Sequence, residues 1–132
     1  MTFRYKIFKD LKFIYAKAEG TLTADDLDNH LDQLVKDPDY IPPMLKLVDQ
    51  RNVKAYGLTN KQAEQFAMKK ASLDNRFLNE KCAILVASDL GFGVARIHQA
   101  FLDESTIQIE VFRSLGNAKK WLDVNISDED LV

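Results

Sequence analysis

The sequence predicts an α/β domain with the element order ββαβαβαβα, in which a mostly parallel sheet carries an antiparallel hairpin at its N-terminal end. Three observations predict this fold class. Apolar and polar residues alternate over residues 3–18, as in half-buried strands. Residues 44–48 form a short apolar run and residues 82–87 an unbroken one, both typical of strands buried on two faces. Segments of helical periodicity follow these runs, and such βαβ units build right-handed crossovers in a parallel sheet.

The first element is a hairpin. Residues 3–18 are expected to form two antiparallel strands joined by a tight turn at Lys9-Asp10. Gly20 is expected to end the second strand.

A helix should follow, with Thr23 as its N-cap and two aspartates in the first turn, where the helix dipole favours negative charge. Apolar residues at i, i+4, i+7 and i+8 over residues 27–35 form one buried stripe. His30 lies at the rim of that stripe and is expected to face solvent. Asp37-Pro38 should stop the helix, and residues 40–43 should form a stiff loop.

The middle of the chain is expected to hold a strand over residues 44–48, ending at Asp49-Gln50-Arg51, and then a loop through Tyr56-Gly57. Thr59 and Gln62 form a capping box that opens a second helix. This helix is expected to bury Ala63, Phe66, Ala67 and Ala71. Residues 82–87 then form the central parallel strand.

The C-terminal part is expected to turn at residues 89–93 into a third helix, which buries Val94, Ile97, His98 and Phe101. A strand over residues 107–112 leads to a last helix that buries Ala118, Trp121 and Leu122. We expect one domain over residues 1–125 and an acidic, frayed tail over residues 126–132.

Composition excludes several classes of protein. The chain of 132 residues has 46% hydrophobic residues, 29% charged residues and a net charge of −2, which argues against a nucleic-acid-binding protein. A single cysteine, Cys82, allows neither an intrachain disulfide nor a cysteine-based zinc site, and two isolated histidines do not make a metal site. No apolar stretch approaches the ~20 residues of a membrane span. We expect a cytoplasmic protein without metal or cofactor.

Several segments, in this order, resemble the SpoIIAA-like group of STAS-related proteins over about Tyr5 to Leu122. They are Gly20-x-Leu22-Thr23, Leu47-Val-Asp49, Gly91-Phe-Gly93-Val-Ala-Arg96-Ile, and Val111-Phe112-Arg113 leading to Ala118-x-x-Trp121-Leu122. The resemblance implies a STAS-like fold and a regulatory or protein-interaction role.

Bacterial antagonists of the STAS kind are switched by phosphorylation of a serine at the start of the second helix. This sequence departs from their motif, since Thr59 is the only hydroxyl near that place and already serves as an N-cap. The group also resembles lipid-binding domains of the CRAL-TRIO kind in fold, which motivates a ligand-binding alternative.

A candidate binding site follows from topology, because ligands of open α/β sheets bind beyond the carboxyl ends of the strands. The polar residues expected at this edge are Asp49, Arg51, Ser88, Asp89 and Arg113. Phe92 and Arg96 lie nearby, in the turn and first helical turn after it. The alternative is that the charged residues only satisfy one another, that Phe92 packs over the sheet, and that Gly91 and Gly93 serve a tight turn rather than an anion site.

Two functions remain open. The first is a non-enzymatic interaction module that acts through this edge and forms homodimers. The second is a carrier or sensor of a small apolar or amphipathic ligand, with Arg96 or Arg113 at an acidic head group and Phe92, Ile97 and Phe101 along the pocket. A carrier needs a cavity of several hundred cubic ångströms. No catalytic motif is present, Cys82 is expected to be buried and unreactive, and His98 to be a core or border histidine.

Overall fold

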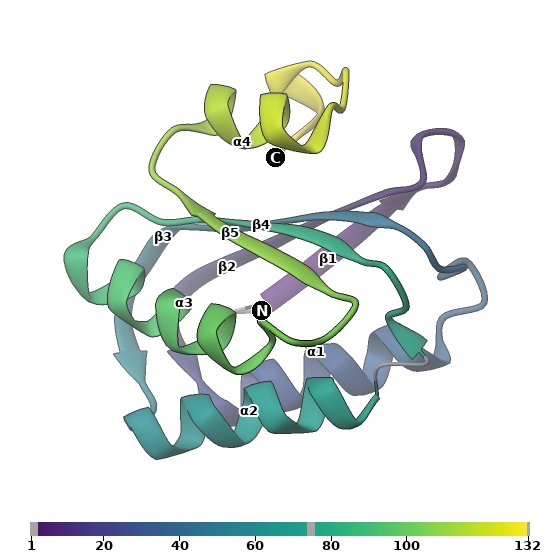
Figure 1. The fold of residues 1–132 in the computed structure, drawn as a ribbon. Coiled ribbons are helices and arrows are strands. Elements are labelled where there is room, and N and C mark those ends of the chain that lie inside the picture. Colours follow the sequence, from purple (N-terminus) through teal and green to yellow (C-terminus); the bar gives the residue numbers. More distant parts are fainter. Residues whose placement is uncertain (1–2, 74–75, 132) are drawn as a thin grey trace.

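The computed structural model describes residues 3–73 and 76–131, which form one five-stranded sheet and four α-helices (Figure 1). The strands lie in the order β1-β2-β3-β4-β5; β1 pairs antiparallel with β2, and all other pairs are parallel. The predicted order ββαβαβαβα is therefore confirmed. The strands are β1 (Phe3–Phe8), β2 (Phe13–Thr23), β3 (Leu45–Gly57), β4 (Lys81–Leu85) and β5 (Gln108–Phe112), and the helices are α1 (Ala24–Lys36), α2 (Asn60–Ser72), α3 (Asp89–Phe101) and α4 (Leu115–Leu122).

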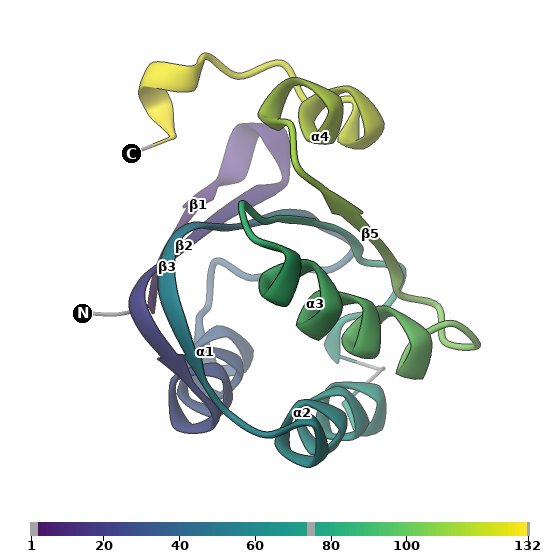
Figure 2. The same ribbon diagram turned by 90° about the vertical axis from the view of Figure 1, so that its left-hand side faces the viewer.

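Helices cover both faces of the sheet. Figures 1 and 2 show α1, α2 and α3 on one face and α4 with the C-terminal segment on the other. Because side chains alternate across a strand, each central strand contributes to both layers. In β3, Val48 packs in the core on the side of α1–α3, whereas Leu47 packs in the core beneath α4. This alternation decides which polar residues of β3 meet.

The predicted N-caps of α1 and α2 are confirmed. The Thr23 hydroxyl accepts a hydrogen bond from the backbone N–H of Asp26, whose carboxylate accepts one from the N–H of Thr23. Thr59 and Gln62 form the same reciprocal box at α2. Thr59 therefore has a structural role, because its hydroxyl satisfies a helix N–H that would otherwise lack a partner.

Two strands are longer than the sequence predicted. Gly20 does not end β2; it adopts a positive φ of 70° inside the strand, where the register with β3 shifts. Likewise, β3 continues through Tyr56 to Gly57, where we expected a loop. In these extensions, β2 and β3 pair with each other beyond the point where β4 ends. Because the resulting two-stranded ribbon is partly exposed, its residues lack the apolar pattern by which a buried strand is predicted.

The inward face of α3 also differs from the prediction. Ala95 and His98 are buried, as is Leu102 just after the helix, whereas Phe101 is 45% exposed and Ile97 only half-buried. In α2 the buried positions include Lys70, while Phe66 and Ala71 are half-buried. A lysine on the inner face was not expected from its place in a basic pair.

The expectation of a frayed tail is wrong as far as Leu131. Val124, Ile126 and Leu131 are buried in the core beneath α4, and a 3₁₀ turn spans Asp128–Asp130. Asp128 pairs with Lys119 of α4 at 2.7 Å. The C-terminal segment was expected to fray because of its acidic composition, but its spaced apolar residues pack in the core and hold it in place. Within residues 3–73 and 76–131, no helix is long and apolar enough to cross a membrane.

We predict that Leu131→Ala lowers the free energy of unfolding by about 2 kcal/mol, because it deletes a buried side chain from the core beneath α4. Glu129→Ala, two residues away at an exposed position, is the matched control and should have almost no effect. Urea denaturation of both variants measures the difference. Equal stabilities would show that the tail does not contribute to the core.

Candidate functional site

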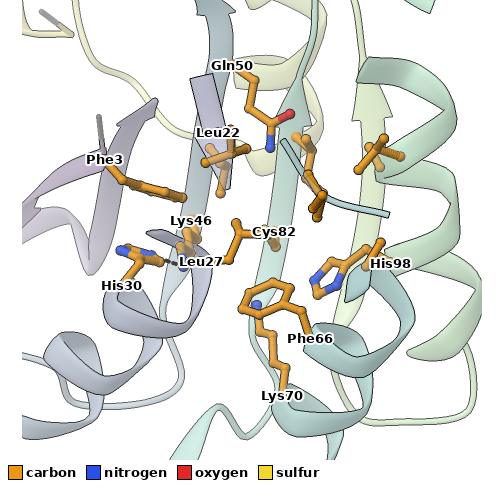
Figure 3. A pocket seen from close by; sticks show the side chains of 16 residues that line it. Phe3, Leu22, Leu27, His30, Lys46, Gln50, Phe66, Lys70, Cys82 and His98 are labelled. Atoms are coloured by element: carbon orange, nitrogen blue, oxygen red, sulfur yellow. Dashed lines mark hydrogen bonds between the residues drawn. The ribbon is translucent and has the colours of Figure 1, made fainter. Parts of the chain in front are cut away.

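A cavity of about 50 Å³ lies between the sheet and helices α1, α2 and α3 (Figure 3). Ten of its sixteen lining side chains are apolar: Phe3, Leu22, Leu27, Val48, Leu58, Ala63, Phe66, Ile84, Val94 and Ala95. The other six are His30, Lys46, Gln50, Lys70, Cys82 and His98. Ionisable side chains rarely line an apolar interior, because burial without a partner is unfavourable. The partners of these six residues therefore define the chemistry of the site.

Strand β3 directs two of the polar side chains into the cavity. Lys46, Val48 and Gln50 alternate along the strand and face α1–α3. Lys46 is only 2% exposed although it carries an amine. Its neighbours Leu45 and Leu47 belong to the opposite core, so a single strand supplies both layers.

The Lys46 amine contacts a histidine of α1. Its Nζ lies 2.7 Å from His30 Nε2, and the His30 ring stacks on Phe3 with centroids 4.2 Å apart. Burial, followed by the charges of Lys46 and Lys70, lowers the pKa of His30 well below its usual value. The imidazole is therefore neutral at pH 7, and Nε2 accepts the hydrogen bond from the ammonium. His30 was expected to face solvent; it is 4% exposed, so that expectation is wrong.

The second buried amine has a carboxylate partner. Lys70 Nζ lies 2.6 Å from Glu80 Oε1, and neither side chain reaches solvent appreciably. The Tyr40 hydroxyl lies 3.5 Å from the other carboxylate oxygen. Burial acts to lower the pKa of Lys70, but the Glu80 carboxylate outweighs it and the pKa is raised. Lys70 is therefore a charged, paired ammonium.

The two amines influence each other. Burial and then the charge of Lys70 lower the pKa of Lys46 to about 8, although Glu80 acts in the opposite direction. Glu80 is engaged at 2.6 Å with Lys70, so Lys46 shares that carboxylate only at longer range. Around the cavity, the described residues thus place two buried amines, Lys46 and Lys70, near one buried carboxylate, that of Glu80.

His98 carries an unsatisfied polar atom. Its Nδ1 is buried without a hydrogen-bond partner among the described residues, and its ring stacks on Phe66 with centroids 5.2 Å apart. Burial, then the charges of Lys70 and Lys46, lowers its pKa well below the usual value, so the ring is neutral. Nearly all buried polar atoms in proteins have a partner, and an exception at a cavity wall marks a place where a ligand or water can bind.

Gln50 completes the polar lining at the other end. The Tyr56 hydroxyl donates a 2.9 Å hydrogen bond to Gln50 Oε1, and the amide nitrogen points into the cavity (Figure 3). Tyr56 is held by a close approach to Gly91, where an added Cβ would lie 2.4 Å from its hydroxyl oxygen. Gly91 is therefore required by packing, in line with the structural alternative to a phosphate-binding turn.

The residues predicted from topology fall elsewhere. Arg51 donates two hydrogen bonds to the Asp49 carboxylate, at 3.0 and 2.8 Å, and the Tyr15 hydroxyl donates a third at 2.6 Å. Burial raises the pKa of Asp49, but the Arg51 and Tyr15 hydrogen bonds outweigh burial and lower it. Asp49 projects from β3 on the side of Tyr15 and the core beneath α4, away from the cavity. This pair satisfies itself, as the alternative interpretation held.

The other predicted residues gather at the start of α3. Ser88 caps the helix by accepting a hydrogen bond from the N–H of Gly91, and Asp89 pairs with Arg113 at 2.8 Å. Phe92 is half-buried against the core, with the guanidinium groups of Arg113 and Arg96 4.9 and 5.9 Å from its ring centre. The ion pairs and hydrogen bonds of the described residues do not join this cluster to Asp49 and Arg51.

Lys46, Lys70 and Glu80 were not predicted as site residues from the sequence. A signal for Lys46 was present, since a lysine inside the apolar run of residues 44–48 must be buried if the strand is central. Lys70 and Glu80 gave no such signal, because their pairing depends on the return of the chain from α2 to β4. Cys82 is buried as expected, and burial raises the pKa of its thiol.

Comparison with known proteins supports the fold. No family model matches the chain, and no curated protein matches it. Among solved structures, it is similar to the crystal structure of an uncharacterized protein from the DUF3478 family with a SpoIIAA-like fold, from Shewanella loihica PV-4. The two chains share 18% identical residues with a TM-score of 0.60, over 91% of this chain and 93% of the other. The predicted SpoIIAA-like fold is confirmed; at this identity the likeness speaks to the fold alone.

We predict that Glu80→Gln destabilises the protein by about 3–5 kcal/mol, because it leaves the Lys70 ammonium buried without its charged partner. The matched control is Asp32→Asn, which breaks the largely exposed pair between Asp32 of α1 and Lys69 of α2 and should cost less than about 1 kcal/mol. Urea denaturation compares the two. A cost for Glu80→Gln as small as that of the control would contradict a buried ion pair.

A second prediction concerns pH. The amine of Lys46 has an ordinary pKa of 10.5 in the unfolded chain and about 8 in the folded protein. Between these values the unfolded state binds more protons, so the free energy of unfolding rises with pH. From about pH 7.5 to about pH 9.5 the wild type should gain about 1–2 kcal/mol relative to Lys46→Met. Urea denaturation at several pH values, with Lys69→Met at a half-exposed position as the control, tests this. Parallel curves for wild type and Lys46→Met would refute it.

Proposed function

We propose that the protein binds a small amphipathic ligand in the cavity between the sheet and helices α1, α2 and α3, and acts as its carrier or sensor. The observation that carries the proposal is the combination, in one mostly apolar cavity, of a polar atom without a partner and an amine without a close counter-ion. His98 Nδ1 has no partner among the described residues, and the Lys46 amine has only a neutral histidine. An apolar pocket with a few convergent polar groups is the usual form of a small-molecule site.

The size of the cavity limits the ligand. A cavity of about 50 Å³ exceeds the roughly 10–15 Å³ that one water molecule needs, but is far below the ~300–1,000 Å³ of sites for drug-sized molecules. The interior therefore suits a compact molecule and does not offer the several hundred cubic ångströms expected for a lipid-sized cargo. The ligand-binding hypothesis is retained here with a smaller ligand.

The residues that would hold the ligand also differ from those first expected. Arg113 is engaged with Asp89 and Phe92, and Phe101 is exposed. From α3, the cavity is lined instead by Val94, Ala95 and His98. The charged head group of a ligand would accordingly meet buried amines from β3 and α2.

A non-enzymatic regulatory or protein-interaction module is the second candidate. One observation favours it: Leu90 is 62% exposed in the first turn of α3, beside the Asp89–Arg113 pair and Phe92. Exposed apolar residues rimmed by charges are common at protein contacts. The homodimer expected from the sequence would be one form of such a contact. In both candidates the protein binds rather than catalyses.

We predict that Ala95→Leu abolishes ligand binding, because the larger side chain fills the cavity from the wall that α3 provides. Ala100→Leu, at an exposed position of the same helix, is the matched control and should bind as the wild type does. Saturation-transfer NMR with a panel of small acids, amides and alcohols measures binding.

The proposal fails if no member of the panel binds the wild type, or if Ala95→Leu binds as well as Ala100→Leu does. Either outcome would leave the interaction module ahead. Circular dichroism of both variants establishes that they are folded before binding is compared.

A further inference from the structure

We infer that the ligand is a small organic monocarboxylate whose carboxylate pairs with the Lys46 ammonium and whose apolar body fills the cavity. This inference rests on the proposed function, because it names the ligand class of the same site. It follows from three features of the lining: its charge balance, its free polar atoms and its apolar majority.

The charge balance leaves one ammonium without a close counter-ion. No aspartate or glutamate is among the described residues that line the cavity. The buried carboxylate nearby is that of Glu80, which lies 2.6 Å from Lys70 Nζ and also accepts a hydrogen bond from the Tyr40 hydroxyl. Lys46 has only the neutral His30 at 2.7 Å. A buried ammonium that lacks a counter-ion is unfavourable, and an anionic ligand would supply the missing charge.

The groups that face Lys46 from the surrounding elements are neutral or positive, apart from Glu80. They are His30 on α1, Lys70 on α2, Cys82 on β4 and His98 on α3. Burial keeps the Cys82 thiol protonated and both imidazoles neutral. A ligand carboxylate here would meet one unpaired ammonium and no carboxylate directly on the cavity wall.

The free polar atoms can complete the recognition of a carboxylate. A carboxylate accepts several hydrogen bonds, and the cavity offers donors besides Lys46. The amide nitrogen of Gln50 points into the cavity, because Tyr56 holds the oxygen of that amide (Figure 3). His98 contributes a buried Nδ1 without a partner, which in the Nδ1–H tautomer is a donor.

The apolar majority selects a monocarboxylate over an inorganic anion. Ten of the sixteen lining side chains are apolar, so they can pack against a hydrocarbon body and cannot replace the water shell of phosphate. One ammonium without a counter-ion matches a single negative charge. The volume of about 50 Å³ is well below the ~150 Å³ of a cavity that binds benzene, so it restricts the body to a short chain and excludes an aromatic ring.

The inference implies a pH dependence of affinity. Burial lowers the pKa of Lys46 to about 8 in the ligand-free protein, so the amine loses its charge as the pH rises through that value. The carboxylate binds the protonated form, and affinity therefore falls above pH 8, by up to about tenfold per pH unit. Neutral analogues of the same shape should show no such loss.

The test compares two isosteric sets: butyrate, butyramide and 1-butanol, and benzoate, benzamide and benzyl alcohol, whose ring the cavity should exclude, with inorganic phosphate as a further anion. Dissociation constants are measured by NMR titration of the wild type from pH 6 to pH 9.5. We expect at least one acid to bind about 10- to 100-fold more tightly than its amide and alcohol at pH 7. Lys46→Met should abolish this preference, whereas Lys69→Met, at a half-exposed position of α2 outside the cavity lining, should keep it.

The outcomes separate this inference from the proposed function. Two results would overturn carboxylate recognition by Lys46 and still leave the cavity as a ligand site. The first is that the neutral analogues bind as tightly as the acids, and the second is that the affinity for the acids does not change up to pH 9.5. Binding of phosphate without binding of either acid overturns it as well. If none of the seven compounds binds and Ala95→Leu behaves as the wild type, the proposed function fails too. The pH series uses the wild type alone, so the test holds even if Lys46→Met does not fold.

Discussion

The alternation of side chains along β3 is the constraint on which the rest of the structure depends. Successive residues of a strand point to opposite faces, so Lys46, Val48 and Gln50 face the three-helix layer, while Leu47 and Asp49 face α4. Strand β3 therefore carries two groups of polar side chains, one on each face of the sheet. The first lines a cavity, and the second closes on itself through Arg51 and Tyr15. A one-residue slip in register would exchange the two faces.

Buried ionisable groups give the cavity its character. The pair of Lys70 and Glu80 joins α2 to the residue before β4, and such pairs contribute little net stability, because desolvation offsets their attraction. Replacing a buried ion pair by two apolar residues of similar volume is often neutral or stabilising, so stability alone does not explain why Lys70 and Glu80 are paired here. In this structure the pair accounts for one amine and leaves Lys46 beside a neutral imidazole. That imbalance distinguishes the cavity from an ordinary packing defect, which would be apolar throughout.

Local features of the chain were predictable from its sequence, and distant pairings were not. The caps at Thr23 and Thr59 and the order of elements depend on residues a few positions apart, and the structure confirms them. Asp49, Arg51 and Arg113 were expected at one edge of the sheet, but Arg51 pairs with Asp49 and Arg113 with Asp89, in two separate clusters. His30 was placed in solvent because the partners that bury it, Phe3 and Lys46, lie in strands 27 and 16 positions away. Periodicity cannot report such contacts.

The central claim is that the cavity between the sheet and α1–α3 holds a small ligand, and a crystal structure of the protein grown with butyrate at pH 7 tests it most directly. We expect electron density for one butyrate molecule inside the cavity, with its carboxylate within hydrogen-bonding distance of Lys46 Nζ. Density for water alone in the cavity, with butyrate absent or bound only at the surface, would contradict the account.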